Sequence, residues 1–395
     1  MKVTSKSWVK LVLLVVMLPF LAAGAVYYVL IHNLNQLITF AVDKETQGGY
    51  VFQTHNLSLS LLHKTVTIDK LVFTRKDTTK ASSYYSIKIP TAYLSVESWQ
   101  ELLINKRLLV DSFSVSRPEI VIHDYRTNAQ GHSQTRFHTS SILENLQKTL
   151  AHLHAKSFNV QGGTFALYKR NTTDPFLIKD INLTVRNFSK IDNDDRRVLA
   201  SDHIELALGR QKWVLSDGKN TLSFRGLHFI SSTQLFEMDS VHFRKPATDR
   251  KGELSLRAEK FFFNSSHLPA VYQKGELWLD TLICLRPVLT LPIESRKDQV
   301  TDTVSTIQSN LKTLFKTVTI GYTQIKDGEL LLGNKTNPVS RGGTQKANMS
   351  IYNLVLNPQS EHSVITDSIN LSLRNIAFFS PDSLFKIGVE SFQMV

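Results

Sequence analysis

Apolar and polar residues alternate in many short segments of this 395-residue chain. Clear examples are KTVTIDKLVF (64–73), HIELAL (203–208) and INLSLRN (369–375). Successive side chains of a β-strand point to opposite faces, so each segment predicts a strand with one apolar face. The sequence therefore predicts a mainly β fold with few short helices, and the expected helices begin at Ser98 or span 141–153 and 302–315.

The alternating segments belong to a tandem duplication. Residues 108–122 (LLVDSFSVSRPEIVI) match 277–291 (LWLDTLICLRPVLTL), which places Pro118 on Pro287. Further matches in the same order pair Gly163 with Gly328 and Asn182 with Asn348. Such repeats typically extend one sheet by adding strands. We expect two β repeat units, 53–217 and 218–395, that form an elongated, curved antiparallel sheet or groove with an open C-terminal edge.

The N-terminal region contains an uncharged stretch from 11 to 31 (LVLLVVMLPFLAAGAVYYVLI). About 20 such residues span a bilayer core. The lysines Lys2, Lys6 and Lys10 precede it without an acidic residue, and the positive-inside rule then places the tail in the cytoplasm. We expect a tail (1–10), a transmembrane anchor (11–31) and a membrane-proximal segment (32–52). The alternative is a cleaved signal peptide ending near Ala23-Gly24-Ala25.

Net charge and motifs exclude several functions. The formal charge is +12, and the basic excess persists without the three N-terminal lysines, which favours anionic lipid headgroups as partners. No basic run alternates with aromatic residues, so nucleic acid is not an expected partner. Nucleophile-elbow, Walker, dinucleotide-binding and His-Glu-x-x-His motifs are all missing from the sequence. We expect no catalytic activity and no cofactor.

Metal-binding patterns are also weak. His152 and His154 have no third ligand at a usual spacing, and the acidic residues at 192–195 are followed by Arg196-Arg197. The one cysteine, Cys284, cannot form an intramolecular disulfide. The sequence therefore predicts no metal site.

Pairs of apolar residues two positions apart mark the candidate functional face. These pairs are Val66 and Ile68, Leu183 and Val185, Leu206 and Leu208, Met349 and Ile351, and Leu371 and Leu373. Each pair lies on one side of its strand. The residues alone leave two interpretations open, which are the lining of an apolar groove and an ordinary dry core.

The segment VESWQELLINKRLLVDSFSVSRPEIVIHDYRTNAQG (96–131) resembles the AsmA-like proteins of Gram-negative bacteria. Their pattern is a short helix with a Leu-Leu pair, a strand, a proline-containing strand and a glycine-containing turn. The match weakens in the second copy, where Pro269 falls inside the helix. The resemblance implies a curved apolar groove, related to that of bridge-type lipid-transfer proteins, in a single-pass inner-membrane protein with a periplasmic body.

Two functions are therefore expected, and they differ in class. The first is a membrane-anchored envelope protein that handles or transports phospholipid through the groove and contributes to outer-membrane homeostasis. An envelope protein at the open C-terminal edge is a further expected partner. The alternative is an anchored periplasmic β-repeat protein with a closed dry core, which binds a glycan or a protein.

Overall fold

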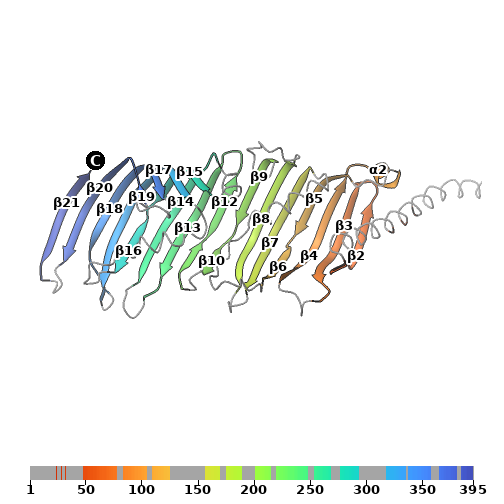
Figure 1. Cartoon of the computed structure of the whole chain (residues 1–395), viewed down its shortest axis with the longest axis horizontal. Coiled ribbons are helices and arrows are strands. Elements are labelled where there is room, and N and C mark those ends of the chain that lie inside the picture. The colour runs from red at the N-terminus through yellow and green to blue at the C-terminus, as the bar shows by residue number, and fades with distance from the viewer. Residues whose placement is uncertain are drawn as a thin grey trace, which may run out of the picture. The chain divides into compact units, whose positions relative to one another are not determined.

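The computed structural model describes a set of ranges separated by gaps. They are residues 24, 28, 32, 48–77, 83–104, 109–124, 156–169, 175–188, 201–214, 219–247, 253–267, 276–292, 317–334, 337–356, 364–379 and 384–394. Within them the chain is mainly β, with 21 strands in a mixed, largely antiparallel sheet (Figure 1). The predicted β class is confirmed. The chain divides into two compact units, which contain β1–β7 and β8–β21.

Helices are few in the described residues. Helix α2 (Trp99–Ile104) follows Ser98, whose hydroxyl accepts a hydrogen bond from the Glu101 backbone N–H at 3.4 Å, as expected for an N-cap. In the described part of the chain, no helix combines the length and apolar character needed to cross a membrane. The predicted anchor (11–31) lies outside this part apart from Gly24 and Tyr28, and the helices expected at 141–153 and 302–315 lie outside it entirely.

The first unit is a small sheet in which two consecutive short strands can pair with the same long strand. Strand β3 pairs with β1 and β2 on one side and with β4 on the other, and β4 pairs with β5 and β6. Both β5 and β6 then pair in parallel with β7. The bounds are β1 Tyr50–Gln53, β2 Asn56–Ser60, β3 Thr65–Arg75, β4 Ser83–Val96, β5 Val110–Ser116, β6 Glu119–Asp124 and β7 Ser157–Lys169.

The second unit contains the same kinds of strand pairing in a longer ladder. Its antiparallel ladder runs from β8 through β9, β12, β13 and β14 to β15, and from β17 through β18 and β20 to β21. Strands β15 and β16 pair in parallel with β17, β10 pairs with β11, and β19 pairs with β18. The bounds are β8 Phe176–Phe188, β9 Ser201–Leu208, β10 Gln211–Val214, β11 Thr221–Phe224, β12 Gly226–Ile230, β13 Leu235–Lys245, β14 Leu254–Asn264, β15 Glu276–Leu285, β16 Val288–Pro292, β17 Thr317–Asn334, β18 Asn337–Leu356, β19 Val364–Ile365, β20 Ser368–Phe379 and β21 Lys386–Met394.

Many strands contain a mid-strand break, which we define as two adjacent residues at which the alternation of faces is interrupted. In β13 the break is Asp239-Ser240, and Ser240 has a φ of 52°. Met238 and Val241 flank it and both lie opposite apolar partners, although residues three apart in a regular strand point to opposite faces. The left-handed residue therefore restores the apolar face beyond the break. Left-handed residues occupy similar places in other strands, namely Lys70, Asp180, Asp327 and Asn375.

Elsewhere the break separates two strands. Arg117 (φ 48°) lies between β5 and β6, and Arg286 (φ 47°) lies between β15 and β16. The Arg117 N–H donates to Gln161 O at 2.7 Å, and the Arg286 N–H donates to Lys326 O at 2.8 Å. The two arginines therefore have the same conformation and the same kind of partner, a backbone carbonyl of the adjacent parallel strand.

Candidate functional site

The candidate site is the apolar face of the sheet in the second unit. Residues directly opposite each other on paired strands share a face, so the ladder can be followed from strand to strand. Beginning in β8 and ending in β21, one line of opposed residues is apolar throughout. We call it row A, and it consists of Ile181, Leu208, Leu227, Met238, Phe261, Cys284, Ile325, Met349, Leu371 and Met394.

A second line runs beside row A on the same face. We call it row B, and it consists of Leu183, Leu206, Phe229, Phe236, Phe263, Leu282, Thr323, Ile351 and Ile369. Its aromatic rings stack, with centroids 4.2 Å apart for Phe229 and Phe236 and 4.6 Å apart for Phe236 and Phe263. The two rows form one continuous apolar surface across this unit.

The structure brings most of the predicted lining residues together on this surface. Leu208, Met349 and Leu371 belong to row A, and Leu183, Leu206 and Ile351 belong to row B. Val185 lies opposite Ile204, and Leu373 lies between Ala347 and Phe392. Val66 and Ile68 belong to β3 in the other unit, where they face Leu59 and Leu57.

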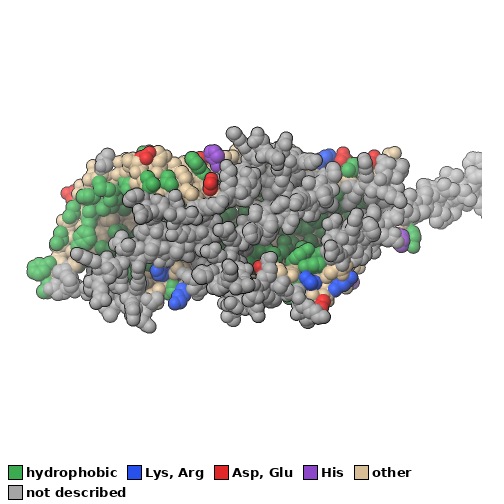
Figure 2. Space-filling model, in the orientation of Figure 1, with side chains coloured by type: hydrophobic (Ala, Val, Ile, Leu, Met, Phe, Trp, Pro, Cys, Tyr) green, Lys and Arg blue, Asp and Glu red, His purple; other side chains and the backbone are tan. Residues whose placement is uncertain are grey.

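Solvent exposure varies along the surface. Most row members are half-buried, and Val185, which lies beside row B, is fully buried. Exposure increases toward the last strands, because Phe378 is 44% and Phe392 is 46% exposed. Figure 2 shows hydrophobic side chains at the left of the view, over these C-terminal strands. Exposed apolar side chains that lie together are typical of surfaces that contact another molecule.

Two members of the surface carry a polar atom. Burial raises the pKa of the Cys284 thiol to about 12, so the side chain is protonated at neutral pH and packs as a small hydrophobe. Thr323 is 8% exposed, and its hydroxyl oxygen Oγ1 has no hydrogen-bond partner within the described residues. Neither group interrupts the apolar surface with a charge.

The opposite face of the sheet carries charged residues as well as apolar ones such as Phe262 and Ile283. Lys260 forms ion pairs with Glu237 and with Asp239, the latter at 3.4 Å, and Arg286 pairs with Glu259. Exposed pairs of this kind contribute little to stability. The two faces therefore differ in that this one carries charged pairs, which rows A and B lack.

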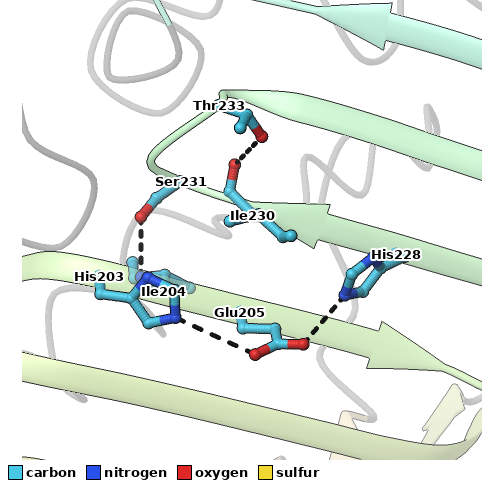
Figure 3. Close-up of polar contacts among 7 residues, drawn as sticks. All are labelled: His203, Ile204, Glu205, His228, Ile230, Ser231 and Thr233. Carbon is cyan, nitrogen blue, oxygen red and sulfur yellow. Dashed lines mark hydrogen bonds and ion pairs between the residues drawn. The ribbon is translucent and has the colours of Figure 1, made fainter.

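A carboxylate between two imidazoles lies on the polar face (Figure 3). The Nε2 atom of His228 is 3.0 Å from Oε1 of Glu205, and Nε2 of His203 is 4.0 Å from Oε2 of Glu205. All three side chains are partly exposed. Groups of side chains suited to hold a metal ion are absent from the described residues, and His152, His154 and Asp192 lie outside them. The cluster therefore offers an exposed polar contact and no developed site.

The prediction from sequence missed the mid-strand breaks. Their signature is apolar-x-apolar-x-x-apolar-x-apolar, as in VTIDKLVF (66–73) and LSLRNIAF (371–378). In β20, Leu371 and Leu373 precede Arg374-Asn375, and Ile376 and Phe378 follow. When the alternation is shifted by one residue at each break, the apolar residues before and after the break fall on the same face of the strand.

Comparisons with known proteins identify no family. No family model matches the chain, and no curated protein matches it. A crystal structure of a sex pheromone staph-cAM373 precursor aligns at 10% identity over 87% of this chain and 92% of that one, with a TM-score of 0.15. The C-terminal domain of such a precursor from Staphylococcus aureus aligns at 10% identity over 72% and 67%, with a TM-score of 0.14. Scores this low carry no argument about fold or function.

Proposed function

We propose that this protein binds the acyl chains of membrane phospholipids on the apolar face formed by rows A and B. The observation that carries the proposal is the unbroken series of apolar partners in row A, from Ile181 to Met394. A methylene group gains about 0.8 kcal/mol on leaving water, so a 16-carbon chain requires an apolar path worth roughly 10 kcal/mol. A short pocket offers no such length, whereas a row that crosses successive strands does.

The proposal includes the setting of the protein. The uncharged segment 11–31, with Lys2, Lys6 and Lys10 before it, anchors the chain in a bacterial inner membrane, and the β body lies in the periplasm. The body consists of two tandem repeats that form a curved groove, and the lipids it carries contribute to outer-membrane homeostasis. The equivalent arrangement of β5, β6 and β7 and of β15, β16 and β17 supports the duplication.

No catalytic step is required. Headgroups remain in water while the tails lie on the apolar face, and the basic excess of the chain favours anionic lipids. The rows supply only apolar contact. Because apolar contacts are non-directional, the surface suits acyl chains that differ in length and in the position of their double bonds.

A second candidate function rests on the buried residues. Val66 and Val185 are 0% exposed and Ile204 is 3% exposed, as in a dry core. In that alternative the apolar face is closed, and the polar surface of the anchored protein binds a glycan or a protein partner. The two candidates differ in whether row A is accessible to lipid in the native membrane.

Site-specific photocrosslinking distinguishes them. Met349 and Ser350 are adjacent in β18 and point to opposite faces, and both are half-buried. We expect a benzophenone amino acid at position 349, introduced into the full chain in cells, to give phospholipid adducts detectable by mass spectrometry. The same residue at position 350 is the matched control. Absence of lipid at 349, or equal labelling at both positions, overturns the lipid proposal.

A further inference from the structure

Strand β21 is an exposed and largely unprotected sheet edge. It pairs with β20 from Phe379↔Lys386 to Leu371↔Met394, and none of the other described strands pairs with its outer side. All nine residues are exposed, and Ile387 and Val389 are 65% and 41% exposed. Natural edges are usually shielded by proline, charge or a covering segment. β21 has no proline, and its two charged residues, Lys386 and Glu390, leave the rest of the edge open to strand addition.

The apolar face defines what an added strand must look like. In β21, Ile387 and Val389 precede the polar pair Glu390-Ser391, and Phe392 and Met394 follow. Opposite them, β20 has the same order of two apolar positions, a polar break and two apolar positions. A strand that continues the apolar face must carry this pattern at the same spacing.

β21 fulfils this requirement for a second copy of itself. Antiparallel pairing about a two-fold axis between Glu390 and Ser391 places Val389 opposite the partner subunit's Phe392. It also places Ile387 opposite the partner subunit's Met394. In a regular strand, residues three positions apart such as Val389 and Phe392 point to different faces, so they could not lie opposite each other in one sheet. The break at Glu390-Ser391 turns both side chains to the same face, which makes this pairing possible. The sheet already uses the same alignment between β13 and β14, where Asp239 lies opposite Lys260 and Met238 opposite Phe261.

The charges on the polar face are compatible with this pairing. Arg374 lies opposite Ser391 in the adjacent strand, and both Arg374 and Glu390 are exposed. In the two-fold arrangement two arginines and two glutamates surround the axis, so positive and negative charges are equal in number. Gly388 leaves room as well, because a Cβ there would meet no atom within 4 Å.

We infer that two copies of this chain join edge to edge through β21 and form a closed dimer in which the apolar face of one copy continues into that of the other. The contact is isologous, so it uses up both edges and does not grow into a filament. It does not depend on what rows A and B bind.

Disulfide trapping tests the register in the full-length protein purified in detergent micelles. In a Cys284→Ala background, the pair Val389→Cys and Phe392→Cys places cysteines opposite each other across the axis, within disulfide distance. Within one strand these positions are about 10 Å apart and cannot bond. The control pair is Ile387→Cys and Phe392→Cys, which lies out of register. We expect covalent dimer to form at least tenfold faster in the first pair; equal rates, or no dimer, overturn the inference.

Solution mass provides an independent readout. We expect the wild-type chain to be dimeric at micromolar concentration by light scattering, after correction for detergent. Val389→Lys places a charge on the exposed edge and should weaken dimerisation at least tenfold while the melting temperature changes by a few degrees at most. A monomeric wild type, or a Val389→Lys variant that remains dimeric, contradicts the inference. A benzophenone at Phe392 that crosslinks to a different envelope protein in cells overturns it in favour of that partner.

Discussion

Gly209 lies so close to Asp180 that position 209 has no room for a side chain. The Gly209 N–H donates to Asp180 O at 3.2 Å, and a Cβ built on Gly209 would be 2.7 Å from the Cβ of Asp180. Asp180 is itself left-handed, with a φ of 52°. The break in β8 at Asp180 thus lies against Gly209, which connects β9 and β10. Glycine permits this close approach because it has no side chain.

Gly209→Ala should therefore destabilise the protein. Overpacking of this kind costs about 1–3 kcal/mol of unfolding free energy. Gly388→Ala is the matched control, because no atom lies within 4 Å of its added Cβ, and its effect should stay within about 0.5 kcal/mol. Urea denaturation of the two variants measures the difference, and equal effects would show that the contact with Asp180 does not constrain the fold.

Ser240→Gly should leave the protein as stable as the wild type or make it more stable. A left-handed conformation costs a non-glycine residue about 1–2 kcal/mol, and glycine relieves this cost, while its extra chain entropy opposes the gain by roughly 0.5–1 kcal/mol. Ser372→Gly is the control in β20, where φ is not positive and only the entropic loss applies. If thermal unfolding shows equal losses for both variants, the left-handed strain at Ser240 is not real.

The Cys284 thiol should react slowly with alkylating agents at pH 8. Burial raises its pKa to about 12, and only the thiolate is nucleophilic. Its alkylation rate should increase about tenfold per pH unit above pH 8 until the thiolate predominates or the protein unfolds. Because the folded pKa exceeds that of the unfolded chain, ionisation of Cys284 favours unfolding as the pH increases from 9 toward 12. Mass spectrometry with N-ethylmaleimide measures the rate, and rapid labelling at pH 7 contradicts this assignment.

Leu371→Asp should abolish lipid binding with little loss of stability. Leu371 is half-buried in row A, and a carboxylate there must be desolvated by any acyl chain that covers it. We expect the melting temperature to stay within a few degrees of the wild type while co-purified phospholipid disappears from native mass spectra.

Two substitutions bracket the Leu371 result. Ser372→Asp points to the polar face and should keep both lipid and stability. Val185→Asp replaces a side chain with 0% exposure and should prevent folding. If Leu371→Asp unfolds the protein as Val185→Asp does, row A is a dry core and the second candidate function becomes the better explanation.

Local alternation was sufficient to predict the fold class, and most of the residues that it selected lie together on the apolar face. Leu206, Met349 and Leu371 each have another apolar residue two positions further along the chain. A strand places two such residues on the same side, whatever its neighbouring strands are. The sequence also predicted α2 from Ser98, because capping depends on residues close in the chain. It did not predict the breaks, because a strict period of two treats Asp239-Ser240 as the end of a strand and not as an interruption within it.

The register between paired strands could not be predicted from the sequence. The chain by itself determined that it would form amphipathic strands with one apolar side, since that follows from residue order and backbone geometry. Only the tertiary structure decided that Met349 lies between Ile325 and Leu371, and that row A therefore continues without a polar residue. The physical reason is that pairing joins residues far apart in the chain, and a shift of one position would turn the same side chains to the opposite face.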